Sequence, residues 1–400
     1  MNSAANTDTN AGPAVLDGPD AARQSLATGT AGIALLHLEH AATGAGPWAE
    51  AHARIRAAAT GPVDGGLHTG LYYGAPAIAF LLHRAAETEE RYQTAAATLD
   101  QHVLRLARRR LTAAFARIHR GNTATLGEYD LLYGLTGIGA LLLHRTPGSD
   151  TFADLLRYLT RLTENTAPLV HNGLSLPGWW AGHDPDPILP TPGGHANLGM
   201  AHGAAGILAL LALAMRHGHV VDHHTEAIDR VTDWFDRWRQ HDTDGTVWWP
   251  QWLTLDDLRT GRPQQREPGR PSWCYGTPGI ARALQLAAIA TNEQTRRAEA
   301  EHTLASCLTA RRLDEITDPG LCHGLAGLYQ TTYRAAGEGR NPALDEQLPM
   351  LAAAIQTAAE AQQSAPEAGL LTGRAGIQLA AATARHDTTM TGWDACLLII

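Results

Sequence analysis

Residues 203–215 read GAAGILALLALAM, a Gly-x-x-Gly motif that leads directly into an uninterrupted apolar run. A helix with no polar face is stable only where neighbouring elements bury it on every side. The same motif introduces an apolar run at seven places, and only the second copy departs, with Ala77 in its last position. The first residues of the seven copies are Gly29, Gly74, Gly134, Gly203, Gly276, Gly324 and Gly373. The sequence therefore predicts seven buried helices, each preceded by a tight glycine turn.

More polar segments with helical spacing lie between these apolar runs. In TEAIDRVTDWFDRWRQ, residues 225–240, apolar side chains recur at three- and four-residue steps and charged side chains occupy the other face. Each repeat is therefore predicted to be a hairpin of one polar outer helix and one apolar inner helix. Seven hairpins closed into a ring would bury every inner helix, so we expect an all-α fold, an (α/α)7 toroid of seven inner and seven outer helices. An open solenoid is the alternative, but it normally has repeats of more uniform length.

The composition excludes several classes of protein. The 400-residue chain has 44% hydrophobic residues, 18% charged residues and a net charge of −9, which argues against a disordered chain and against a nucleic-acid binder. It contains no apolar run of the about 18 residues that a membrane helix needs, and its start lacks the pattern of a signal peptide. Four scattered cysteines are too few for a disulfide scaffold. We expect a cytoplasmic protein with no integral membrane segment.

The repeats span almost the whole chain. The first 20 residues match no copy of the repeat, so we expect 1–20 to be a flexible tail and 21–400 to be a single toroid domain. Because each motif precedes its inner helix, all seven turns should gather at one mouth of the ring, where the helix N-termini present partial positive charge. Two long loops rich in Gly, Pro and Trp, residues 174–200 and 243–270, also enter this mouth. Loops of this length inside a compact domain are usually functional.

Candidate metal ligands lie in two of the glycine turns. Cys274 lies two residues before Gly276, and the pair Cys322 and His323 comes directly before Gly324. The fifth and sixth repeats are neighbours in a ring, so these side chains should meet at the mouth although they are distant in sequence. Two thiolates and one imidazole suit zinc, and three protein ligands leave a fourth position open for water or substrate. The alternative is that the cysteines are small buried hydrophobic residues.

Further reactive side chains are expected at the same mouth. His202 comes directly before Gly203, where a helix N-terminus favours the neutral imidazole of a base or proton relay. Asp130 lies four residues before Gly134 and either orients that histidine or caps a helix. Arg270 would supply a fixed cation and Tyr275 a hydrogen bond, unless the tyrosine only packs. By contrast, the loop histidines at 68, 183 and 195 are expected to be exposed to solvent.

These motifs together resemble the lanthionine synthetase C-like cyclases. The resemblance rests on YDLLYG, MAHGAAG, SWCYGTPGIA, LCHGLAG and TGRAGI, in this order, and it runs from about Gly29 to the terminal WDACLLII. It implies a toroid of seven inner and seven outer helices that binds one Zn²⁺ per chain. By the resemblance the metal ligands are Cys274, Cys322 and His323, and the catalytic residues are His202, Asp130, Arg270 and Tyr275.

The resemblance implies ring closure in a ribosomally made precursor peptide, as in lantibiotic biosynthesis. A cysteine thiol of the dehydrated peptide adds to dehydroalanine or dehydrobutyrine and gives lanthionine or methyllanthionine. No dehydratase region precedes the repeats, so the family also implies a separate dehydratase, and an exporter whose complex would bring the cytoplasmic protein to the membrane. Protein prenyl transfer, glutathione addition to dehydrated residues and a zinc-stabilised peptide-binding scaffold without turnover are the competing hypotheses. Intact His202 and Asp130 count against the scaffold, because binding alone does not require them.

Overall fold

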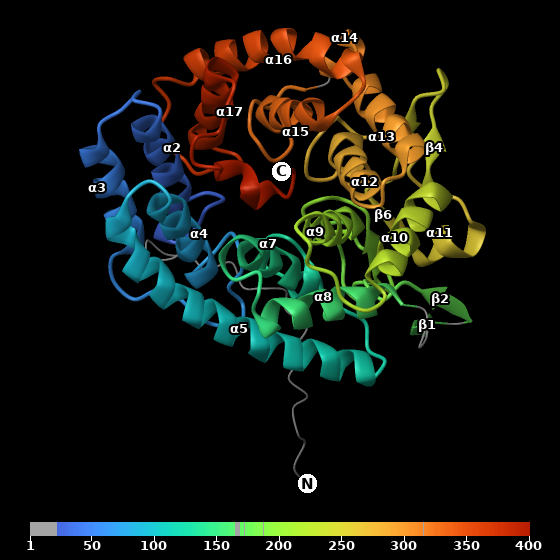
Figure 1. Cartoon of the computed structure of the whole chain (residues 1–400). Coiled ribbons are helices and arrows are strands. Elements are labelled where there is room, and N and C mark those ends of the chain that lie inside the picture. Colours follow the sequence, from blue (N-terminus) through green and yellow to red (C-terminus); the bar gives the residue numbers. More distant parts are fainter. Residues whose placement is uncertain (1–21, 165–168, 172, 187, 315) are drawn as a thin grey trace.

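Seven inner helices form a closed ring in the computed structural model, which describes residues 22–164, 169–171, 173–186, 188–314 and 316–400. The inner helices are α2 (Thr30–Ala42), α4 (Ala75–Ala86), α7 (Leu135–Arg145), α9 (Ala204–Arg216), α12 (Thr277–Ala290), α15 (Leu325–Glu338) and α17 (Arg374–His386). Each begins at the residue that follows the first glycine of a motif copy. Each packs against the next, and α17 packs against α2, so the predicted closed ring is confirmed (Figure 1).

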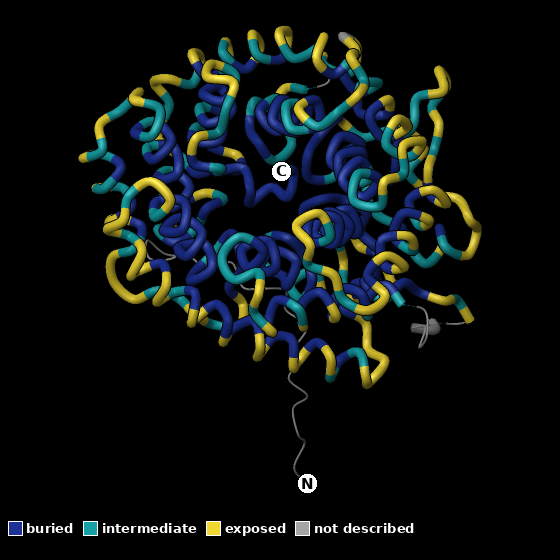
Figure 2. Tube along the Cα trace, in the orientation of Figure 1, coloured by how far each residue is buried: buried dark blue, intermediate teal, exposed yellow. Residues whose placement is uncertain are grey.

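A second layer of helices surrounds this ring and carries most of the exposed surface (Figure 2). Within the described residues six helices take outer positions, one between each pair of inner helices that follow each other in the chain. They are α3 (Trp48–Ala59), α5 (Gln93–His119), α8 (Asp150–Thr163), α10 (His224–Trp238), α13 (Gln294–Ser306) and α16 (Pro342–Ala361). The all-α toroid is confirmed, and the predicted tail at 1–20 lies outside the described residues. None of the described helices combines the length and apolar character that a membrane span requires.

The inner helices are buried because their sequences offer no polar face. In α9 every residue from Ala204 to Ala214 is buried. The outer helix α10 has apolar residues on one side only, and it buries Ile228, Val231 and Phe235. The contrast between the two helices follows the apolar patterns of their sequences.

Short elements complete the chain. The short helices are η1 (Glu90–Tyr92), α6 (Leu126–Tyr129), α11 (Leu255–Thr260), α14 (Ala310–Leu313) and η2 (Trp393–Leu397). Three antiparallel strand pairs lie in the long loops or directly before them: β1 (Leu169–His171) with β2 (Leu174–Leu176), β3 (His195–Asn197) with β6 (Trp252–Thr254), and β4 (Gln240–His241) with β5 (Val247–Trp248). In the β3–β6 pair, Asn197 lies opposite Trp252, and this pairing ties the two long loops together near the mouth.

The second glycine of the motif packs the inner helix against the turn that precedes it in every repeat but the second, where Ala77 takes its place. A Cβ on Gly279 would lie 2.0 Å from the carbonyl oxygen of Trp273, and a Cβ on Gly327 would lie 1.9 Å from that of Leu321. Real Cβ atoms do not approach carbonyl oxygens so closely, so only glycine fits there without a shift of the backbone. The glycines are therefore required for packing in the turn.

The seven turns are joined by a closed ring of backbone hydrogen bonds, which we call the annulus. Its seven acceptors are the carbonyl groups of the residues two positions before the first glycine of each repeat, namely Ala27, Tyr72, Leu132, Ala201, Cys274, Cys322 and Leu371. Five of the donors are N–H groups of these same residues, and the other two are the N–H groups of Leu26 and Leu131, one position earlier. The seven N–H to O distances are 3.0 Å for Leu26 to Tyr72, 3.2 Å for Tyr72 to Leu132, 3.0 Å for Leu131 to Ala201, 3.2 Å for Ala201 to Cys274, 3.1 Å for Cys274 to Cys322, 2.8 Å for Cys322 to Leu371 and 2.9 Å for Leu371 to Ala27. The predicted gathering of all seven turns at one mouth is confirmed.

Candidate active site and metal centre

Two cysteines and a histidine meet where the fifth and sixth turns join. One ligand atom from each of Cys274, Cys322 and His323 lies within 4.8 Å of the others. The juxtaposition follows from the annulus, because the Cys274 N–H donates to the Cys322 carbonyl oxygen at 3.1 Å. Cys274 is buried, and the other two are partly exposed. Two sulfurs and one imidazole nitrogen at this spacing fit zinc, and a site with three protein ligands would leave a fourth position for water or substrate.

The charges around the two thiols favour a single thiolate. A hydrogen bond from Cys322 lowers the pKa of Cys274 to about 5, and contacts with His323 and Ser272 act in the same direction against burial. The pKa of Cys322 is raised, first by its hydrogen bond to Cys274 and then by burial and by the neighbouring negative charge. One negative charge is thus already present where a divalent cation would bind, and the cation would favour ionisation of the second thiol.

Asp318 orients the histidine of this cluster. Its Oδ2 lies 3.1 Å from His323 Nε2, and its Oδ1 accepts a hydrogen bond from the Gly320 N–H at 2.6 Å. The pKa of His323 is raised, first by its hydrogen bond with Cys274. A carboxylate that holds one imidazole nitrogen leaves the other free as a ligand and strengthens it. Sequence reasoning missed Asp318, although it belongs to the same turn, DPGLCHG, at residues 318–324.

His202 and Asp130 form a second reactive group at the mouth. His202 Nδ1 donates to Asp130 Oδ2 at 2.6 Å, so the ring presents Nε2 as its free nitrogen. The other carboxylate oxygen, Oδ1, accepts the N–H groups of Tyr133 and Gly134, each at 2.7 Å. Asp130 therefore orients the histidine and holds the turn that leads into α7, but it is not the helix cap, because the N-cap residue of α7 is Gly134.

Tyr275 links this pair to the candidate metal ligands Cys274, Cys322 and His323, a group of side chains that we call the metal cluster. Its ring stacks on that of His202, with centroids 5.8 Å apart and planes 29° apart. The Cys274 carbonyl oxygen accepts the Ala201 N–H at 3.2 Å, which holds the fourth and fifth turns side by side. Burial raises the pKa of Tyr275, and the negative charges of Cys274 and Asp130 raise it further. The phenol therefore remains a hydrogen-bond donor at neutral pH.

Arg270 lies at the exposed edge of the metal cluster. Its side chain is exposed and makes no hydrogen bond or ion pair with another described residue. Its positive charge acts on Cys322, where it opposes the rise of the thiol pKa, and on His323. The guanidinium is thus near the metal cluster and free to pair with a negative charge that arrives with a substrate.

Two polar residues of β3 lie beneath the mouth, and the sequence did not predict their role. Asn197 is buried, its Oδ1 accepts the Gly199 N–H at 2.9 Å, and its side chain lies near Tyr275, where it acts to lower the tyrosine pKa against the effect of burial. The prediction that His195 is exposed is wrong. Pairing of β3 with β6 buries it completely, its Nδ1 donates to the His183 carbonyl oxygen at 2.8 Å, and burial lowers its pKa to about 4.

Comparison with known proteins gives a consistent result. The family model described as "Lanthionine synthetase C-like protein" matches residues 20–398. The nisin biosynthesis protein NisC of Lactococcus lactis subsp. lactis is 26% identical over 270 residues, a match that covers 66% of this chain and 62% of that protein. Among solved structures, a nisin cyclase superposes with a TM-score of 0.77 at 22% identity, over 94% of this chain and 92% of that one. The structural match establishes a common toroid fold.

Proposed function

Because this chain belongs to the lanthionine synthetase C-like family, we propose that it is a zinc-dependent peptide cyclase. It forms lanthionine and methyllanthionine by intramolecular addition of cysteine thiols to dehydroalanine and dehydrobutyrine in a dehydrated precursor peptide. The observation that carries the proposal is the position of the Cys274, Cys322 and His323 cluster, whose ligand atoms lie within 4.8 Å of one another. It adjoins the hydrogen-bonded pair of His202 and Asp130 at one mouth of the ring.

The cluster would hold one zinc ion through Cys274, Cys322 and His323. Bound there, zinc supplies a Lewis acid that lowers the pKa of a substrate thiol held at its open position. The chain's own contribution is to fix this geometry. The annulus bond between Cys274 and Cys322 spaces the two sulfurs, and Asp318 holds the imidazole of His323.

The reaction needs one proton to leave and one to arrive. The thiolate sulfur forms a bond to the β-carbon, the π electrons of the dehydro residue move to the carbonyl oxygen as an enolate, and the α-carbon then takes a proton. The Nε2 atom of His202 is the free nitrogen placed to carry that proton, because Asp130 holds the opposite nitrogen at 2.6 Å. This role as acid or base requires Asp130 to keep the ring in one orientation.

Two further side chains would stabilise the enolate. Tyr275 stays protonated and lies between the cluster and His202, so its hydroxyl can donate a hydrogen bond to the developing negative oxygen. Arg270 has a guanidinium without a partner among the described residues, at the edge of the same cluster. Both groups offer positive potential where charge develops.

We also propose where the enzyme acts and which proteins act before and after it. Residues 21–400 would act as one domain in the cytoplasm. A separate dehydratase must supply the dehydro residues, and an exporter would take the finished product. The relative named as a nisin biosynthesis protein supports a role in a biosynthetic route.

The test is a cyclisation assay on a peptide that contains one dehydroalanine and one free cysteine. Ring closure leaves the peptide mass unchanged and removes the thiol that an alkylating reagent would label. We expect zinc-loaded wild type to remove it, and Cys274→Ala to leave it in place. Cys307→Ala is the matched control, since Cys307 is a buried cysteine of α13's C-terminal end, outside the cluster. Binding of the peptide without loss of the thiol would instead support the scaffold. A parallel reaction contains added glutathione, and a mass gain of one glutathione there would support glutathione addition.

A further inference from the structure

The last residues of the chain run through the middle of the toroid. Figure 1 shows the C-terminus at the centre of the ring, enclosed by the inner helices. Residues 393–399 are all buried, and Trp393, Asp394, Cys396, Leu397 and Ile399 have no exposed surface. We call Thr391–Ile399 the axial segment. A buried charged residue and buried backbone groups need partners, and those partners lie on several different helices.

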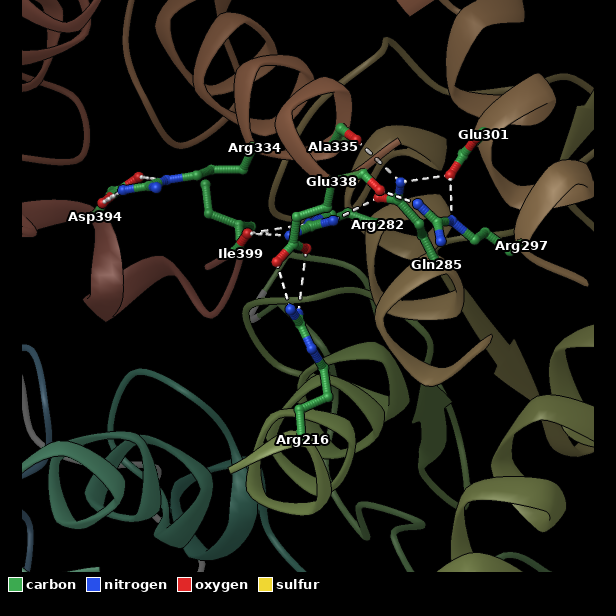
Figure 3. A network of polar contacts seen from close by, with 10 residues as sticks. All are labelled: Arg216, Arg282, Gln285, Arg297, Glu301, Arg334, Ala335, Glu338, Asp394 and Ile399. Atoms are coloured by element: carbon green, nitrogen blue, oxygen red, sulfur yellow. Dashed lines mark hydrogen bonds and ion pairs between the residues drawn. The ribbon is translucent and has the colours of Figure 1, made fainter. Parts of the chain in front are cut away.

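One end of the axial segment is fixed near the C-terminal ends of the inner helices. Glu39 of α2 accepts hydrogen bonds from the Thr391 N–H at 2.9 Å and from its hydroxyl at 2.5 Å. The Asp394 carboxylate accepts from Arg334 at 2.7 and 2.8 Å (Figure 3). It also accepts from Gln330 at 2.7 Å, so that both of its oxygens are used. Helices α2 and α15 therefore hold the segment at this depth.

The other end turns back toward α12. Leu398 has a φ of 54°, a left-handed conformation that reverses the chain direction. The Ile399 carbonyl oxygen accepts from the fully buried Arg282 at 3.0 and 2.8 Å. Arg282 also pairs with Glu338 at 2.6 Å, and Glu338 pairs with Arg216 of α9 (Figure 3). The segment is thus tied to α9, α12 and α15 as well.

Between these two ends the axial segment reaches the annulus from inside the ring. The Cys396 carbonyl oxygen accepts the Tyr72 hydroxyl at 2.9 Å, and the Leu397 carbonyl oxygen accepts the Trp273 indole N–H at 3.0 Å. Tyr72 is the annulus member of the second repeat. Trp273 is fully buried and directly precedes Cys274 in the chain. The segment therefore braces the annulus at two turns, and one of them carries a candidate metal ligand.

We propose that the axial segment positions the metal centre through Trp273. The Cys274 main chain is held on both sides by annulus bonds to Ala201 and Cys322, which fix its place around the ring. The bond from Trp273 to Leu397 fixes the preceding residue toward the axis of the ring. Trp273 is also held from the other side, since its carbonyl oxygen packs against Gly279 of α12. These restraints together fix the main chain from which the Cys274 side chain extends toward Cys322 and His323.

The inference rests on the proposed function only in treating the cluster as a metal site. Trp273 is a positioning residue in this scheme, because it touches neither substrate nor ligand atoms. Loss of its indole N–H should therefore change how tightly the site holds a metal. A purely structural role would instead lower the stability of the fold and leave the affinity of the folded protein for metal as it is.

The test compares Trp273→Phe with Trp249→Phe in the full chain. Trp249 is also buried, and its indole N–H donates to a backbone carbonyl, that of Phe235, at 2.8 Å, away from the cluster. Each variant loses one buried indole hydrogen bond. Affinity for Zn²⁺ is measured by competition with a chromogenic chelator, and Co²⁺ absorption reports the ligand geometry. We expect Trp273→Phe to bind Zn²⁺ about tenfold more weakly, which is the usual loss when a residue that orients a metal ligand is replaced. We expect Trp249→Phe to match wild type.

A second variant keeps the proposal falsifiable if Trp273→Phe does not fold. Tyr72→Phe removes the other bond between the annulus and the axial segment, and we expect a smaller loss of Zn²⁺ affinity. Wild-type affinity in every folded variant of Trp273 and Tyr72 would overturn this inference and leave the proposed function intact. Wild-type protein that takes up no Zn²⁺ would overturn both.

Discussion

Two groups of three neighbouring turns share the hydrogen bonds of the annulus and differ in their side chains. The fourth to sixth turns form one group, which we call the metal half, and the seventh, first and second turns form the other. Within both groups neighbouring turns are joined by N–H to carbonyl bonds of 2.9 to 3.2 Å. In the metal half the two residues before the first glycine of the motif are Ala201 and His202, Cys274 and Tyr275, and Cys322 and His323. In the other group they are Leu371 and Thr372, Ala27 and Thr28, and Tyr72 and Tyr73. The chemistry is thus added to a scaffold that exists without it.

The packing of the glycines leads to the same conclusion. A Cβ on Gly376, in the seventh turn, would lie 1.9 Å from the Leu370 carbonyl oxygen, and a Cβ on Gly327, in the sixth, would lie 1.9 Å from that of Leu321. The steric demand is equal where there is chemistry and where there is none. The glycines are therefore required by the fold, and the reactive residues beside them are free to vary.

The largest effect should come from Cys322→Ala. The variant gives the sixth turn the residue that the first turn already has at this position, Ala27, so the annulus should persist. We expect complete loss of tight Zn²⁺ binding and of cyclisation, because two ligands cannot hold the ion as three do. Metal analysis measures Zn²⁺ binding, the loss of the peptide thiol measures cyclisation, and circular dichroism checks that the variant is folded. Unfolding of the variant in the absence of metal would show that the two halves are not separable as described.

The next effect should come from His202→Asn, which changes the fourth turn. We expect cyclisation to slow by about 10²- to 10⁴-fold, the usual loss when a general acid or base is removed. Zn²⁺ content should remain that of wild type, because His202 belongs to the pair with Asp130 and not to the metal cluster. Single-turnover rates with a metal-loaded sample measure the chemistry. A normal rate would remove His202 from the mechanism.

The sequence revealed most of the scaffold, because its signals are local. A glycine turn followed by an apolar run, within about 15 residues, predicts each inner helix. The closed ring follows from the need to bury all seven inner helices. Cys274, Cys322, His323 and His202 could be placed at the mouth because they occupy fixed positions in that local motif.

Contacts between distant segments could not be predicted in this way. The burial of His195 depends on pairing of β3 with β6, more than 50 residues away. The path of the axial segment depends on Arg282, Arg334 and Trp273, none of which belongs to a local pattern with it. Its apolar sequence indicates burial but does not say where. Tertiary contacts decide both features.

A smaller effect is expected from Asp318→Asn, behind the metal ligand of the sixth turn. The amide can still accept from the Gly320 N–H, so the turn should keep its shape. It holds His323 less strongly than a carboxylate does, and we expect Zn²⁺ affinity to fall by about 10- to 100-fold. Chelator competition measures the fall. Unchanged affinity would mean that Asp318 serves only the turn.

The glycine comparison predicts equal losses of stability in the two halves. Gly376→Ala and Gly327→Ala should each lower the free energy of unfolding by about 1–3 kcal/mol, the usual cost of overpacking. Gly337→Ala is the control for the second variant, because it lies in the same helix, α15, and nothing approaches its Cβ within 4 Å. It should stabilise slightly, since alanine favours helix. Denaturant unfolding measures all three. A much larger loss of unfolding free energy in Gly327→Ala than in Gly376→Ala would show that the fold depends more on the metal half than on the other turns.

The smallest effect is spectroscopic and concerns the protein without metal. The pKa of Cys274 is lowered to about 5, whereas burial raises that of Cys307 to about 12. Of these two thiols, only that of Cys274 should be ionised near pH 7. A lowered pKa means that the folded protein binds fewer protons than the unfolded chain. The stability that the Cys274 thiolate adds to the folded protein is therefore full above the pKa of the unfolded chain, near 9, and is lost as the pH falls through the folded pKa of about 5. Thiolate absorbance at about 240 nm should disappear over that fall and be absent in Cys274→Ala. Cys307→Ala should titrate like wild type, and a midpoint near the ordinary cysteine pKa would mean that the fifth turn does not prepare its thiol for a metal.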